Sequence, residues 1–167
     1  MRYHNITHDD MMNGDGLRVV LWVAGCEHHC DECHNPITWN IDGGIEFTEA
    51  DRQELMTYLG KDHAAGVTFS GGDPLHPANR GDVGKLILDV KALYPDKDIW
   101  VYTGYQWDEI KNLPLMKNVD VLVDGEYRKE FHKPDLHWRG STNQKIINVP
   151  KSLELGTIVL WKEPGAR

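Results

Sequence analysis

The most reactive side chains of this sequence are gathered in one place, because its three cysteines, Cys26, Cys30 and Cys33, lie within eight consecutive residues. Cysteine thiolates are soft ligands, so three of them on one short segment can bind zinc, copper(I) or an iron-sulfur cluster. An odd number of closely spaced cysteines is poorly suited to structural disulfides. The segment therefore predicts metal ligation or redox chemistry.

The spacing of the cysteines does not by itself select the metal. Zinc requires a fourth protein ligand, for which His28, His29 or His34 is available, and would then form a closed Cys3His site. An iron-sulfur cubane held by only three cysteines leaves one iron open to an outside ligand. The residues alone leave both alternatives open.

A second segment that could bind a ligand is the run Gly71, Gly72, Asp73 and Pro74. Paired glycines allow a ligand to approach backbone polar groups that a side chain would otherwise block. A tight turn accounts for the same residues, because Gly-Gly and Asp-Pro are frequent in turns. Taken alone, this run predicts a turn.

Four segments rich in β-branched and aromatic residues are predicted to be strands that position these two motifs: residues 18–24, 66–70, 98–103 and 119–124. Their nearly continuous apolar character is typical of parallel strands whose faces are covered by helices. The cysteines directly follow the first strand, and residues 71–74 directly follow the second. Because ligands bind beyond the carboxyl ends of parallel strands, both motifs are expected at one edge of the sheet.

Helical patterns separate these strands. Residues 49–59 follow a capping box, the apolar residues of 83–93 recur with helical spacing before Pro95, and 107–113 form a shorter helix. This alternation predicts right-handed βαβ units. A complete eight-fold barrel needs about 250 residues, so we expect an α/β fold with an open or partial (βα) barrel and a mostly parallel sheet. Two additional strands are expected at 145–149 and 157–162, with a loop over 127–143.

Composition limits the class of protein. A chain of 167 residues and 19.1 kDa fits a single domain, 1–167. The formal net charge of -8 argues against nucleic acid as a partner, since phosphate binding needs a basic face. The longest wholly apolar run, 19–24, is too short to cross a membrane. Residues 1–10 lack the pattern of a secretion signal, so the cytoplasm is the expected location.

The Cys-x3-Cys-x2-Cys spacing of the cysteines resembles the signature of the radical S-adenosylmethionine superfamily, and residues 71–74 resemble its second motif. The resemblance implies that Cys26, Cys30 and Cys33 hold a 4Fe-4S cluster whose fourth iron is chelated by S-adenosylmethionine. It also implies that the backbone and the acid, Asp73, of the second motif hold the amino group of the cofactor. Many members carry an aromatic residue where this chain has Glu32, so only backbone contacts to adenine are expected there. The implied cofactor-binding residues are Glu32, Cys33, His34, Gly71, Gly72, Asp73 and Pro74.

Other segments resemble one branch of that superfamily, the glycyl-radical-enzyme activases. These segments are 13–18, Asn35 with 38–40, 124–125 and 138–144, and the last resembles the activases of anaerobic ribonucleoside-triphosphate reductase. The resemblance extends from about residue 13 to residue 147. Activases of pyruvate formate-lyase share the run Cys-His-Asn at residues 33–35 but are longer and lack this tail, and they remain the alternative.

The resemblance implies a reaction in which the cofactors carry the chemistry and no acid-base residue is needed. One electron cleaves S-adenosylmethionine, and the resulting 5'-deoxyadenosyl radical takes a hydrogen atom from a glycine of the reductase large subunit. The implied partners are that subunit and a flavodoxin-like one-electron donor. The open edge and residues 126–143 are the expected contact surface. A zinc-binding module without catalysis, and a radical enzyme acting on a small molecule, are the competing functions.

The remaining polar and aromatic candidates have simpler interpretations. His28 and His29 are expected to face water, with hydrogen bonding to the cluster as the alternative. Residues 103–105 end a strand or line the cofactor pocket. Trp138 and Arg139 either anchor an interface or pack the tail against the sheet. Six scattered histidines are expected to be structural or exposed: His4, His8, His63, His76, His132 and His137.

Overall fold

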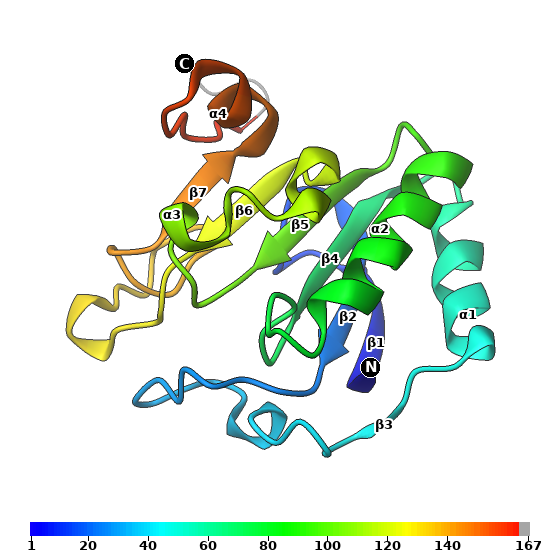
Figure 1. The fold of residues 1–167 in the computed structure, drawn as a ribbon, viewed down its shortest axis with the longest axis horizontal. Helices are drawn as coiled ribbons and strands as arrows, with labels where there is room; N and C mark the ends of the chain where they lie inside the picture. Colours follow the sequence, from blue (N-terminus) through cyan, green and yellow to red (C-terminus); the bar gives the residue numbers. More distant parts are fainter. Residues whose placement is uncertain (164–167) are drawn as a thin grey trace.

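The computed structural model describes residues 1–163, which build one open sheet of seven strands (Figure 1). The spatial order is β3-β1-β2-β4-β5-β6-β7. The strands are β1 Arg2–Asp10, β2 Leu17–Val23, β3 Ile45–Glu46, β4 Ala64–Gly71, β5 Asp98–Tyr102, β6 Val121–Asp124 and β7 Lys145–Asn148. β2, β4, β5 and β6 are parallel neighbours, whereas β1, β3 and β7 are antiparallel additions. The four predicted strands are confirmed as a parallel centre, and the sheet does not close into a barrel.

The two ends of the chain differ most from the prediction. β1 was not expected, because its polar and histidine-rich sequence has no apolar alternation, yet it pairs with β2. The strand expected at 157–162 is wrong: only a single bridge, between Leu160 and Ile147, forms there. The preceding residues instead form the helix α4, Val149–Leu155, which ends at Gly156 with φ of 70°. Strand β7 is confirmed.

Three further helices follow the predicted positions: α1 Glu49–Leu59, α2 Arg80–Leu93 and α3 Trp107–Ile110. α1 begins at the expected capping box, in which the backbone N–H of Thr48 donates to Asp51 Oδ2 at 2.7 Å. α3 is a single turn that ends at Ile110, before the end of the expected helix 107–113, and a separate 3-10 turn, Pro114–Asn118, follows it. Shorter 3-10 turns occupy Pro36–Thr38 and Lys129–Phe131 within otherwise irregular loops.

α1, α2 and α3 cover one face of the sheet, with α2 in front of it in Figure 1, whereas α4 lies at the end of β7. Alternate residues of the central strands point into this main core, such as Leu21 of β2 and Phe69 of β4, against Leu55 of α1 and Ile87 of α2. The opposite face is covered by chain segments instead of helices, and its cluster comprises Trp100, Val121, Val123, Tyr102, Trp138, Ile146 and Trp161. The expectation of helical cover therefore holds for one face only.

Arg18 lies on that second face with its side chain fully buried. Its guanidinium donates to Thr68 Oγ1 at 2.8 Å and to Asp98 Oδ1 at 2.5 Å, and it lies 5.4 Å from the centre of the Trp100 ring. A buried charge is tolerated when its donors are paired in this way. Arg18, the last residue of the segment 13–18, thus has a structural role on this face of the sheet.

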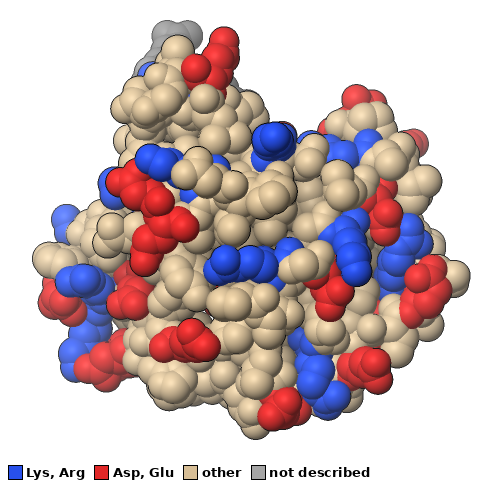
Figure 2. Space-filling model, in the orientation of Figure 1, with Lys and Arg blue, Asp and Glu red and all other residues tan. Residues whose placement is uncertain are grey.

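Acidic and basic side chains are interspersed on the face of the molecule drawn in Figure 2. That face therefore lacks the continuous basic surface on which phosphate backbones bind. Within residues 1–163, no helix combines the length and the apolar character needed to span a membrane.

Replacing Gly84 by alanine is expected to raise the free energy of unfolding by about 0.5–1 kcal/mol, because glycine inside a helix costs conformational entropy. Gly84 lies in the middle of α2, and an added Cβ would lie 3.5 Å from Leu115 Cβ, an ordinary contact. Equilibrium urea unfolding measures the change. A lower unfolding midpoint for the variant would contradict the packing described for α2.

Candidate active site at the carboxyl edge of the parallel strands

The two motifs lie at the same edge of the sheet, as predicted. The cysteine loop leaves the end of β2, residues 71–74 leave the end of β4, and the two segments are joined by backbone hydrogen bonds. The N–H of Gly72 donates to the carbonyl of Val23 at 2.8 Å, and the N–H of Asp73 donates to the carbonyl of Gly25 at 2.7 Å. The motifs therefore form one structural unit.

This contact explains why both positions of the second motif are glycine. A Cβ on Gly72 would lie 2.6 Å from the carbonyl oxygen of Gly25 and 2.9 Å from that of Thr38. Gly71 has φ of +102°, and a Cβ there would lie 2.6 Å from the backbone nitrogen of Val23. The close approach that glycine permits is thus between the two motif loops, and contact of residues 71–74 with a ligand remains a prediction.

Backbone hydrogen bonds join the start of the cysteine loop to the residues that follow the loop. The N–H of Gly25 donates to the carbonyl of Thr38 at 2.7 Å, and the N–H of Cys26 donates to that of Trp39 at 3.1 Å. All three cysteines are free and partly exposed. Burial raises the pKa of the Cys26 thiol to about 11 and raises that of Cys30 as well. When no metal ion is bound to them, these two thiols therefore keep their protons at neutral pH.

The donor set of this loop consists of three thiols and the neighbouring imidazoles. Among residues 1–163, no three His, Cys, Asp or Glu side chains already converge on a common metal position, so the thiols would have to draw together to hold a metal. Both ring nitrogens of His28 contact carboxylates, whereas His29 stacks on Trp39 and His34 packs against Tyr127 through their rings only. The residues therefore fit a cluster held by three cysteines and also a Cys3His zinc site with His29 or His34.

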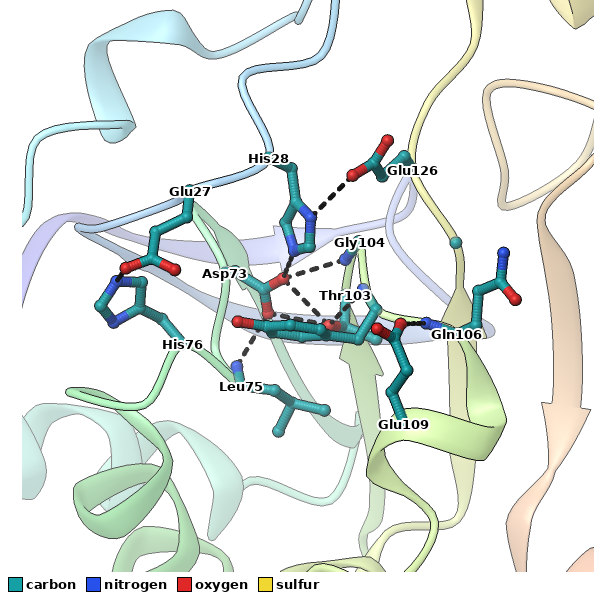
Figure 3. Close-up of polar contacts among 12 residues, drawn as sticks. Glu27, His28, Asp73, Leu75, His76, Thr103, Gly104, Gln106, Glu109 and Glu126 are labelled. Carbon is teal, nitrogen blue, oxygen red and sulfur yellow. Dashed lines mark hydrogen bonds and ion pairs between the residues drawn. The ribbon is translucent and has the colours of Figure 1, made fainter.

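Asp73 is the buried polar centre of this edge, with 1% of its surface exposed. Its carboxylate accepts hydrogen bonds from the backbone N–H groups of Leu75 at 2.8 Å and Gly104 at 3.0 Å, and from Thr103 Oγ1 at 2.9 Å. His28 Nε2 lies 2.7 Å from Asp73 Oδ2 (Figure 3). These contacts occupy the acceptor positions of the carboxylate and join the ends of β4 and β5 to the cysteine loop.

His28 points inward between two carboxylates (Figure 3), so the expectation that it faces water is wrong. Its second ring nitrogen, Nδ1, lies 3.0 Å from Glu126 Oε1, just after β6, and 11% of the side chain is exposed. The hydrogen bond to Asp73 raises the pKa of His28 above its usual value, although burial opposes the rise. His29, in contrast, is exposed and stacks on Trp39, with ring centres 4.5 Å apart.

A cavity of about 640 Å³ opens at the same edge. Its lining residues are Glu27, His28, Gly104, Tyr105, Gln106, Glu109, Glu126, Arg128 and Asn143. The volume lies within the range of roughly 300–1,000 Å³ that small-molecule sites have. Gly104 and Tyr105 lie in the segment 103–105 that the sequence placed at a pocket or a strand end. Glu32 and His34 are exposed, and neither they, nor the three cysteines, nor residues 71–74 are among the residues that line this cavity.

The tail with the activase-like sequence folds back on the sheet. Trp138 packs edge-on against Trp100 at 6.0 Å between ring centres, and its carbonyl accepts a hydrogen bond from the Tyr102 hydroxyl at 2.7 Å. Arg139 Nη1 donates to the carbonyl of Gln144 at 2.6 Å within the same tail. The packing interpretation of Trp138 is confirmed, and contact of the tail with a partner remains a prediction.

The six scattered histidines lie outside the cysteine loop and the second motif, except that His76 approaches the loop. Its Nε2 lies 3.1 Å from Glu27 Oε1. His8 and His63 pair with exposed acidic side chains, and His132 Nδ1 contacts the carbonyl of Gly140. Structural or surface roles are therefore the better interpretation for these residues.

The chain is similar in sequence to a protein family and to several named proteins. Residues 12–147 match the protein family described as a 4Fe-4S single cluster domain. The anaerobic ribonucleoside-triphosphate reductase-activating protein of Enterobacteria phage T4 is 47% identical over 146 residues, which cover 87% of this chain and 93% of the phage protein. The chain belongs to the family of anaerobic ribonucleoside-triphosphate reductase-activating proteins. The proteins of that name from Escherichia coli K12 and Vibrio cholerae are 41% and 42% identical, covering 89% and 87% of this chain and 99% and 97% of their own lengths.

Membership in this family agrees with the resemblance that the sequence suggested. The matched range includes all three cysteines, residues 71–74 and the tail 138–144. It also includes His28 and Glu126, which sequence reasoning did not bring together. They lie 98 residues apart, and no periodic pattern or motif relates them.

Proposed function

We propose that this chain activates anaerobic ribonucleoside-triphosphate reductase by generating a glycyl radical on the large subunit of that enzyme. Membership in the family of reductase-activating proteins supports the partner. The observation that carries the mechanism is the backbone junction between the three-cysteine loop and residues 71–74. The junction supports the proposal because the loop proposed to hold the cluster and the turn proposed to hold the cofactor lie side by side.

A bound 4Fe-4S cluster would supply the one electron needed to cleave S-adenosylmethionine to methionine and a 5'-deoxyadenosyl radical, which would become 5'-deoxyadenosine by taking a hydrogen atom from the glycine. Cys26, Cys30 and Cys33 hold the cluster in this proposal, and the backbone of residues 32–34 and 71–74 holds the cofactor. The carboxylate and the backbone carbonyl of Asp73 are already engaged by protein donors, so we assign the amino group of the cofactor to the other backbone carbonyls of 71–74 instead of to the acid. The protein binds and orients the cofactor and shields it from side reactions, and no acid-base residue takes part.

The proposed partners follow from the same reaction. The open edge of the sheet and residues 126–143 receive the glycine-bearing segment of the reductase, and a flavodoxin-like protein supplies the electron. The cavity beside His28 lies on this edge and is the candidate pocket for the cofactor or for the entering segment. We place the protein in the cytoplasm as a single domain, 1–167, without nucleic-acid or membrane partners.

An anaerobic assay tests the proposal. The protein is reconstituted with iron and sulfide, reduced with dithionite and mixed with S-adenosylmethionine, first alone and then with the reductase. Formation of 5'-deoxyadenosine together with a glycyl radical signal on the reductase is the expected result. 5'-Deoxyadenosine without that signal would indicate a radical enzyme with another substrate, and its absence in both mixtures, with an intact reduced cluster, would refute the proposal.

A further inference from the structure

Within the described residues, ionic side-chain contacts connect the cysteine loop to the rest of the protein at three positions, Glu27, His28 and Asp31. Glu27 pairs with His76, and Asp31 pairs with Lys129 at 2.5 Å, but Glu27 and Asp31 are 70% and 73% exposed. Ion pairs this exposed contribute little to stability. The contacts of His28 with Asp73 and Glu126 are the third connection, and among these three only they combine two carboxylate partners with a side chain that is 11% exposed.

We propose that His28 is a positioning residue that fixes the cysteine loop against the ends of β4 and β6, and so holds Cys26 and Cys30 where the cluster is bound. The role of the loop rests on the proposed function. The geometry does not: the imidazole contacts Asp73 Oδ2 at 2.7 Å and Glu126 Oε1 at 3.0 Å, and these carboxylates come from different strand ends. Hydrogen bonds to charged groups in such sites are stronger than neutral ones.

Gly104 provides an independent argument that the position of the His28 ring matters. A Cβ on Gly104 would lie 2.4 Å from His28 Cδ2, so any larger residue would displace the imidazole. The backbone φ of Gly104 is outside the left-handed region, so its conformation does not require glycine. The Tyr105 ring also packs against the imidazole in a T-shaped arrangement, with ring centres 4.7 Å apart. The fold therefore keeps a space of matching shape for this histidine.

The first experiment uses the metal-free full-length chain and a protease that cleaves after glutamate. Cleavage after Glu27 and Glu32, located by mass spectrometry, reports opening of the cysteine loop, and cleavage after Glu154 in α4 reports general unfolding. His28→Ala is expected to accelerate cleavage of the loop roughly ten- to a hundredfold, the range that loss of charge-assisted hydrogen bonds gives. The matched control is His29→Ala, the neighbouring exposed histidine, which should leave the rate within about twofold of the unmodified protein.

Additional variants separate positioning from general stability. His28→Gln retains a donor directed at Asp73 and should restore part of the protection. Gly104→Ala should reproduce the effect of His28→Ala without changing the histidine, and the double variant should be no worse than either single one, because both remove the same contact. If His28→Ala also accelerates cleavage after Glu154, the milder variant Glu126→Gln is tested instead. It is expected to increase the cleavage rate of the cysteine loop severalfold without changing the rate after Glu154.

A second measurement addresses the cluster without an activity assay. After reconstitution, removal of iron by a ferrous chelator is followed spectroscopically, and it should be at least about tenfold faster for His28→Ala than for His29→Ala. Equal rates of loop cleavage for these two variants would overturn the positioning role. A protein that binds no iron at all would overturn the proposed function, while the metal-free experiment would still decide the role of His28.

Discussion

Replacing any one of Cys26, Cys30 and Cys33 by serine is expected to abolish formation of 5'-deoxyadenosine. Each thiolate is proposed to hold one corner of the cluster, and a serine hydroxyl, protonated at neutral pH and a harder ligand, does not replace it. Changes in outer contacts of metal sites already cost roughly ten- to a hundredfold, so loss of a direct ligand should exceed a hundredfold. Iron content and 5'-deoxyadenosine are measured on the same reconstituted samples.

The control for the cysteine variants is that the fold itself should persist. The three thiols are partly exposed and lie outside the main core, so urea unfolding of the metal-free serine variants should match that of the unmodified chain within about 1 kcal/mol. His29→Ala, in the same loop, should retain both iron and turnover. Turnover that persists in any cysteine variant would contradict the assignment of the cluster ligands.

The sequence predicts the parallel centre of the fold because its strands are continuous apolar runs. Residues 18–24 and 66–70 read as buried strands, and their ends necessarily share an edge when the strands are parallel neighbours. The elements that sequence reasoning missed are those whose stability comes from partners. β1 is a polar strand that gains its hydrogen bonds from β2, and residues 157–162 have strand-like composition but follow a helix that ends at Gly156.

The residues of the candidate site also fall into those that local sequence identifies and those that only the fold brings together. Motif spacing identifies the cysteines and residues 71–74, because local sequence alone carries those patterns. The position of His28 depends on Asp73 and Glu126, which are 45 and 98 residues away and become neighbours only through the sheet order. A pair of adjacent histidines, one buried and one exposed, gives no sequence signal that would distinguish them.

Gly72→Ala is expected to destabilise the protein by about 3 kcal/mol, the upper end of the range for overpacking. The new methyl group would lie 2.6 Å from the carbonyl oxygen of Gly25, 2.9 Å from its carbonyl carbon and 2.9 Å from the carbonyl oxygen of Thr38. These are backbone atoms on two segments, so no side chain can rotate away. Relief requires the two motif loops to separate, which breaks the hydrogen bond from Asp73 N–H to the Gly25 carbonyl.

The consequence for function should exceed the consequence for stability. A domain of this size has roughly 5–15 kcal/mol of stability, so most of the Gly72→Ala protein remains folded at 25 °C. Its cysteine loop and residues 71–74, however, would no longer share one arrangement, and formation of 5'-deoxyadenosine should fall far more than the folded fraction. Urea unfolding and the anaerobic assay measure the two effects. Gly84→Ala is the matched control, since the same substitution inside α2 should stabilise the chain and leave the assay unchanged. A Gly72→Ala protein as stable and as active as the Gly84→Ala protein would show that the two loops do not meet as described.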